Sequence, residues 1–207
     1  MLPEKLQDIL TNHDPEDIAI SILQVDNENP DPSFKIQVSG FGYNGEENYV
    51  LEWIIKTIQF RSSRISFDPG SSIEISNDDP LLWYYSDKLC SIYFNGSCND
   101  TDKLFLDLYR VHNSIFNGQL NFEETLNQPY NFDSLIQSEN GLLASGPRKL
   151  LEKYAAALSK HNIQYSIIGD RVPQYWDGQK HNDENGNAKV LFIDNSYIIA
   201  DDFVFVG

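Results

Sequence analysis

The stretch VLFIDNSYIIADDFVFV, residues 190–206, decides the fold class. It contains two apolar segments, 190–194 and 197–206, whose β-branched and aromatic side chains predict strands. Only Asn195 and Ser196 lie between them, a spacing that suits antiparallel pairing. The C-terminal part of the chain is therefore expected to form antiparallel strands.

Apolar segments bounded by turn residues predict further strands upstream. These strands are expected at residues 17–25, 33–39, 48–60, 89–94 and 163–168. Segment 48–60 is ambiguous, because its composition favours a strand while polar Asn48, Glu52 and Lys56 recur at helical spacing. A strand is preferred there. Segments 64–67 and 72–76 flank a turn-forming Asp-Pro-Gly sequence and predict a β-hairpin.

Apolar stripes at helical spacing predict two main amphipathic helices, at residues 100–116 and 147–160, and a shorter helix at 3–10. The sequence has no sustained repeat and no regular alternation of strands with helices, and no linker-like segment divides it. We therefore expect a single α+β domain over residues 1–207, with a largely antiparallel sheet.

The net charge of the chain limits the classes of molecule that it is expected to bind. Its 31 Asp and Glu against 15 Lys and Arg give a formal net charge of -16 and a pI near 4.4. A field of this sign repels phosphate backbones and anionic lipids and attracts basic proteins. The composition is also 41% hydrophobic and 13% aromatic, which predicts a folded chain. A basic protein partner is expected, and neither nucleic acid nor a membrane.

The location is inferred from what the sequence lacks. Its first residues resemble no signal peptide, and no apolar run is long enough to span a membrane. Two cysteines, Cys90 and Cys98, suggest reduced thiols rather than a disulfide framework. A cytoplasmic location is expected.

A dinucleotide-binding pattern, G-x-G-x-x-G, occurs at residues 40–45. Glu46 and Glu47 follow it, and their negative charge is unfavourable where a helix N-terminus would meet pyrophosphate. Because Asn44-Gly45 is also a strong hairpin signal, a hairpin is preferred over a nucleotide site.

Residues 141–149 resemble a phosphate-binding loop, but Pro147 stands where such a loop has its lysine. Ser145, Gly146, Arg148 and Lys149 nevertheless surround the expected start of a helix, where free N–H groups and positive side chains can hold an anion. The alternative is that these residues only cap the helix.

The remaining polar motifs are weaker. Segment 181–186 has the oxygen spacing of a calcium loop but begins with histidine and lacks the closing Glu. Asp201 and Asp202 are adjacent in a predicted strand, so their side chains face opposite sides, and an edge or a bulge is the default interpretation. The four histidines lie in four different elements, and no cluster of basic residues surrounds Cys90 that would lower the pKa of its thiol. No catalytic residue, metal site or cofactor is predicted.

Adjacent aromatic residues form two groups, at 83–85 and 175–176, and the three adjacent rings of the first group cannot all face one core. Exposed Trp and Tyr are common anchors of protein interfaces, although the alternative is that this aromatic-rich chain packs them internally. The candidate interface residues are Trp83, Tyr84, Tyr85, Tyr175 and Trp176.

Together these features predict a non-catalytic, soluble, acidic intracellular protein that binds a basic protein. One version is an immunity-type protein that neutralises a cationic toxin or nuclease. Two alternatives stay open: a small-ligand or anion-binding protein or enzyme with a pocket near residues 145–149, and a structural subunit with a large exposed apolar patch.

Overall fold

The computed structural model describes residues 2–27, 31–41, 48–176, 179–184 and 186–207. The chain forms two compact units: unit 1 comprises Met1–Leu82 and Tyr175–Gly207, and unit 2 comprises Trp83–Gln174. Unit 2 is thus inserted into the sequence of unit 1. The single domain expected over residues 1–207 stays a prediction.

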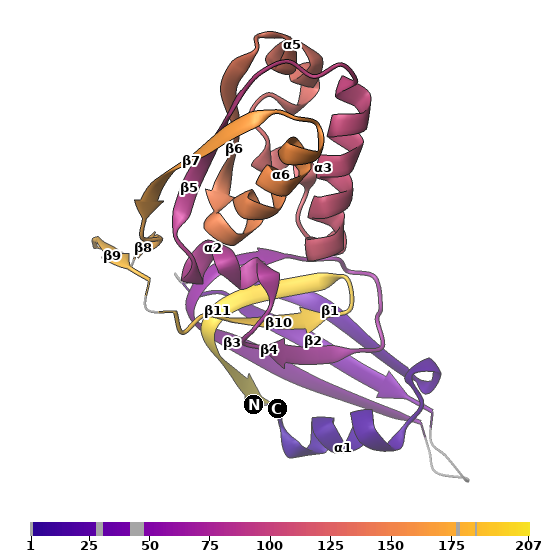
Figure 1. Cartoon of the computed structure of the whole chain (residues 1–207). Coiled ribbons are helices and arrows are strands. Elements are labelled where there is room, and N and C mark those ends of the chain that lie inside the picture. Colours follow the sequence, from indigo (N-terminus) through magenta and orange to yellow (C-terminus); the bar gives the residue numbers. More distant parts are fainter. Residues whose placement is uncertain (1, 28–30, 42–47, 177–178, 185) are drawn as a thin grey trace. The chain divides into compact units, whose positions relative to one another are not determined.

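Unit 1 is built on a six-stranded antiparallel sheet with the strand order β1-β2-β3-β11-β10-β4 (Figure 1). The strands are β1 (Ile18–Asp26), β2 (Ser33–Gly40), β3 (Tyr49–Arg64), β4 (Ile73–Ser76), β10 (Lys189–Ile193) and β11 (Ser196–Val206). A separate ribbon pairs β8 (Gln174–Trp176) with β9 (His181–Asp183). Short 3-10 turns lie at Pro15–Asp17 and Pro80–Leu82.

The core of unit 1 lies between this sheet and helix α1 (Glu4–Asn12), which covers one face of the sheet (Figure 1). Leu6 and Ile9 of α1 are buried against alternate residues of the strands, because successive side chains of a strand point to opposite faces. Phe34, Ile36 and Ile55 are fully buried in this layer. The predicted helix at 3–10 and the strand at 48–60 are confirmed.

The hairpin predicted for residues 64–76 is wrong. Arg64 pairs with Tyr197 of β11, whereas β4 pairs with β10. Between them, Gly70 exchanges two backbone hydrogen bonds with Ile20 of β1. The local sequence permits a tight turn, but pairing with distant strands, which buries Ile73, determines the path of the chain.

Unit 2 has a three-stranded antiparallel sheet with the order β6-β5-β7. Its strands are β5 (Leu89–Asn95), β6 (Asn140–Pro147) and β7 (Gln164–Arg171). Its helices are α2 (Trp83–Ser86), α3 (Thr101–Phe116), α4 (Phe122–Thr125), α5 (Phe132–Gln137) and α6 (Arg148–Lys160), with a 3-10 turn at Pro129–Asn131. Within this unit α3 and α6 lie side by side (Figure 1). The two main helices and the α+β class with its largely antiparallel sheet are confirmed.

Helix α3 begins and ends as its sequence predicts. The carboxylate of Asp100 accepts a hydrogen bond from the backbone N–H of Lys103, and Asn117 ends the helix in the left-handed conformation. Its buried His112 is 2.8 Å from the hydroxyl of Tyr154 on α6. Capping and packing therefore fix α3 against α6. In the described part of the chain, no helix combines the length and apolarity that crossing a membrane requires.

The hairpin predicted at Asn44-Gly45 lies outside the described residues. The strands on either side, β2 and β3, pair antiparallel with Gly40 opposite Tyr49. A strand therefore follows the G-x-G-x-x-G pattern, where a dinucleotide site requires a helix.

Candidate functional site

The negative charge of the chain is concentrated in unit 1. This unit carries 21 Asp and Glu against 7 Lys and Arg, whereas unit 2 carries 10 against 8; together these make the 31 and 15 of the whole chain. The formal net charges are therefore -14 and -2. The negative field of the molecule is therefore strongest around unit 1.

A buried ionic cluster lies at the side of unit 1 where the ribbon meets the sheet. Between the pairs Ile199–Ser62 and Ala200–Phe60, strand β3 contains one extra residue that has no partner in β11. This residue is Arg61, and it forms a β-bulge. Its guanidinium donates to both carboxylate oxygens of Glu184, at 2.5 and 2.9 Å, and to Asp201 at 3.0 Å. The side chains of Arg61 and Glu184 are only 3% and 1% exposed.

The charge of Arg61 is maintained despite this burial. Burial lowers the pKa of Arg61, but the hydrogen bonds and charge of Glu184, with the charge of Asp201, outweigh it and the pKa is raised. The guanidinium also lies 4.1 Å from the centre of the Tyr175 ring, a cation–π distance. The cluster thereby fixes Tyr175 of β8 and the residue after β9 to the sheet.

Trp176, the neighbour of Tyr175, is 57% exposed. Its ring centre lies 5.0 Å from that of His181 on β9, which is also exposed. The ribbon thus holds Tyr175 half-buried against Arg61 while Trp176 contacts solvent.

The other three candidate interface residues lie in unit 2 and are half-buried. Trp83 contacts Phe116 edge to face, and the ammonium of Lys149 lies 5.7 Å from its ring centre. Tyr84 lines a pocket with Gly146, and burial raises its pKa. Tyr85 is also partly covered. Among the five candidates, Trp176 presents the most open aromatic surface.

The sequence interpretation missed an apolar stripe on the unit 1 sheet, which we define as Val50, Ile54, Ile58, Val204 and Val206. These side chains are 41–62% exposed. Ile54 is paired with Val206, whereas Val204 is paired with Lys56, so charged side chains interrupt the stripe. The sequence contains a signal for it: β3 is apolar at both odd and even positions, and in a sheet covered on one face only, one of these sets is exposed.

Two of the four residues predicted to bind an anion, Arg148 and Lys149, already have carboxylate partners from this chain. Asp87 accepts a hydrogen bond from the backbone N–H of Lys149 at 2.7 Å, at the start of α6. Arg148 donates to Asp170 at 2.6 Å, and this bond lowers the pKa of Asp170. Ser145 and Gly146 lie in strand β6 rather than in a loop. The carboxylate of Asp87 therefore supplies the negative charge that the start of α6 was predicted to bind.

Ser145 and Gly146 also line a pocket of about 460 Å³ in unit 2. The hydroxyls of Ser145 and Ser91 are 3.0 Å apart, and Arg171 lies at the same pocket. This pocket adjoins the residues of the small-ligand alternative.

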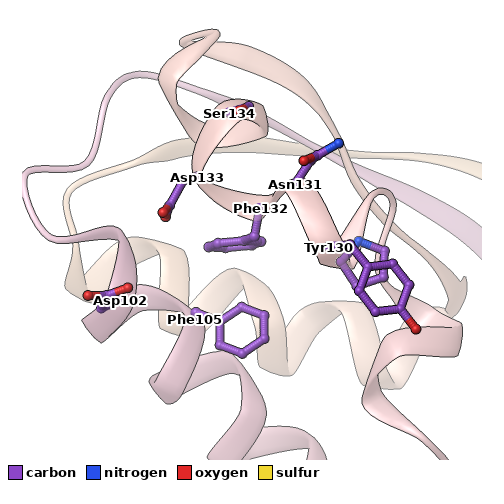
Figure 2. Close-up of a pocket in the computed structure, with 8 residues that line it drawn as sticks. Asp102, Phe105, Tyr130, Asn131, Phe132, Asp133 and Ser134 are labelled. Carbon is purple, nitrogen blue, oxygen red and sulfur yellow. The ribbon is translucent and has the colours of Figure 1, made fainter.

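A second pocket of unit 2, of about 380 Å³, lies between the start of α3 and the segment around α5. Figure 2 shows the rings of Phe105 and Phe132 between the carboxylates of Asp102 and Asp133 on one side and Tyr130 on the other. Tyr130 is 86% exposed and donates a hydrogen bond to Glu123. The described lining of this pocket includes two carboxylates and no basic side chain.

The candidate metal and carboxylate motifs begin in, or lie within, strands β9 and β11. Within the described residues, no group of three or more His, Cys, Asp or Glu is placed to hold a metal ion. The segment considered as a calcium loop starts in strand β9, and its residue 185 lies outside the described residues. Asp201 binds Arg61 while Asp202 accepts from Lys189, so the adjacent carboxylates have separate partners beside a bulge.

Comparison with known proteins gives no match to this chain among family models, curated proteins or solved structures. The function is therefore inferred from its own residues.

Proposed function

We propose that this chain is a non-catalytic, acidic binding protein whose unit 1 engages a basic protein. The observation that carries the proposal is the concentration of charge: 21 acidic against 7 basic residues in unit 1. Such a field speeds the association of an oppositely charged partner and disfavours nucleic acid. An immunity-type protein that neutralises a cationic toxin or nuclease inside the cell is the specific version we favour.

Trp176 is the anchor residue in this proposal. Opposite charges speed the association of two proteins but do little to slow their dissociation. Aromatic side chains that become buried in the interface slow dissociation. Trp176 is exposed, and Tyr175 beside it is held by the Arg61 cluster, so the indole loses little conformational freedom on binding. The apolar stripe of the same unit offers additional contact area.

The test is an affinity capture from native lysate with the tagged wild-type chain, Trp176→Ala and Tyr130→Ala. Tyr130 is the matched control, because it is an exposed aromatic on the nearly neutral unit 2. We expect a basic protein that is captured at low salt, is lost as salt rises, and is reduced by Trp176→Ala only. Capture that is insensitive to salt, or equal for the two variants, would contradict the proposal.

A small-ligand function is the second candidate, favoured by the pocket that contains Ser91, Ser145 and Arg171. Inorganic phosphate or a nucleotide that binds there would raise the melting temperature of the folded chain. Arg171→Ala should abolish that increase, and an increase that survives the substitution would place the ligand elsewhere.

A further inference from the structure

Three side chains that are distant in the sequence meet in unit 2: Cys98, Asp107 and His161. Cys98 lies just before α3, Asp107 lies on α3, and His161 follows the last residue of α6. The Sγ of Cys98 is 3.8 Å from Nδ1 of His161, and Nε2 of the same ring is 3.1 Å from a carboxylate oxygen of Asp107. A thiol, an imidazole and a carboxylate are thus aligned in the order used for nucleophilic catalysis.

One tautomer of His161 satisfies both contacts. With its proton on Nε2, the ring donates to Asp107 and directs the lone pair of Nδ1 at the thiol. The hydrogen bond from His161 lowers the pKa of Asp107, so this carboxylate stays ionised and holds the ring in that orientation. The thiol has a second acceptor, the backbone oxygen of Asp100 at 3.3 Å.

The ends of two helices bring these groups together. Cys98 lies just before the N-terminus of α3, and His161 lies at the C-terminus of α6. Asp107, further along α3, contacts the far nitrogen of the His161 ring.

Cys98 is also accessible, in contrast to the other cysteine. It is half-buried, whereas Cys90 is buried, and both are free thiols. Burial raises the pKa of Cys90, and its thiol donates to the backbone oxygen of Gly169 at 2.8 Å. Cys90 therefore serves as an internal reference for an unactivated thiol.

We propose that Cys98 is a nucleophilic thiol that accepts acyl groups from activated esters or thioesters, with His161 as its base and Asp107 as a positioning residue. The proton of Sγ moves to Nδ1 of His161 while the sulfur electron pair forms a bond to the acyl carbon. The bond between that carbon and the leaving oxygen or sulfur breaks, and the leaving group takes the proton from His161. The product is a thioester on Cys98. This site is in unit 2 and is independent of the binding proposed for unit 1.

The first test measures alkylation of the full chain by iodoacetamide at neutral pH. Both cysteines lie in the tryptic peptide 89–103, so fragment ions of that peptide assign each adduct. We expect Cys98 to react at least about tenfold faster than Cys90, and His161→Gln to remove most of that advantage. Equal rates at the two cysteines, or an unchanged rate in His161→Gln, would overturn the proposal. Cys90 also reports folding, since it becomes reactive only in a variant that has unfolded.

The second test uses p-nitrophenyl acetate as the acyl donor. The wild type should release p-nitrophenol with formation of one acetyl adduct on Cys98, and Cys98→Ser should form none. If the adduct forms elsewhere, or the release is the same in both proteins, acylation of Cys98 is wrong.

Asp107 is tested by partial rescue. Asp107→Ala should slow acylation, while Asp107→Asn, which keeps an oxygen that can accept from Nε2 of His161 but lacks the charge, should restore part of the rate. Asp102→Ala, a nearby acidic residue of α3 on a different face, is the control for loss of charge. Equal losses in the alanine and asparagine variants would exclude the positioning role.

Discussion

Arg61 and Glu184 lie 123 residues apart in the sequence and form a two-point ion pair in which both side chains are almost completely buried. A buried ion pair adds little net stability when intact, but removing one partner leaves a buried charge without compensation. We therefore predict that Arg61→Met lowers the free energy of unfolding by about 3–5 kcal/mol in urea denaturation.

The exposed pair Lys35–Glu52 of the same sheet provides the control. Its side chains are 39% and 47% exposed, so water screens the interaction. Lys35→Met should change the free energy of unfolding by less than about 1 kcal/mol. Similar losses of unfolding free energy in Arg61→Met and Lys35→Met would show that burial does not determine the cost of breaking an ion pair.

Asp87→Ala should lower stability by about 1 kcal/mol, because the start of α6 loses the carboxylate that accepts from Lys149. The vacated helix start should then accept inorganic phosphate, which raises the melting temperature of the variant more than that of the wild type. Glu152→Ala, further along α6, is the matched change of charge. An equal response to phosphate in all three proteins would refute the role of Asp87.

His112 should make stability dependent on pH. Burial lowers its pKa below the ordinary value near 6.5, which the unfolded chain retains. As the pH falls below that value, the unfolded chain takes up a proton that the folded chain does not, so stability is lost. Between pH 7.5 and 5, we expect the wild type to lose more stability than His112→Gln in denaturant titrations. His181→Gln, which changes an exposed histidine, should behave like the wild type.

Alanine substitutions at two neighbouring residues of β3 should lower the free energy of unfolding by very different amounts. Ile55 is fully buried in the core of unit 1, so Ile55→Ala should lower the free energy of unfolding by about 2–5 kcal/mol. Ile54 belongs to the apolar stripe and is 41% exposed, so Ile54→Ala should cost less than about 1 kcal/mol. Equal destabilisation would mean that both faces of the sheet are covered in solution.

Local residues were sufficient to predict most elements of the fold. The limits of α3 depend on Asp100 and Asn117, which act within one turn of the helix. The C-terminal strands pair as their short connection requires. The division into two units was not predictable in this way, because unit 2 is inserted between segments of unit 1 without linker-like sequence at either junction.

The candidate sites depended more on distant residues. The sequence indicated Trp176 through its aromatic neighbour, and the preference of the α6 start for an anion through its residue types. It did not indicate that Asp87 meets that preference, nor that His161 lies beside Cys98, 63 residues earlier. Such contacts are set by how strands and helices pack, and no local pattern encodes them.

The sequence by itself therefore determined the charge, the α+β class and the helix limits, because these follow from composition, periodicity and contacts within a few residues. Only the tertiary structure decided where the charge is concentrated, which strands pair at long range, and which polar groups meet. The physical reason is that burial of apolar surface selects among pairings that the local sequence permits equally, and the ionic and thiol clusters form where those pairings bring their residues together.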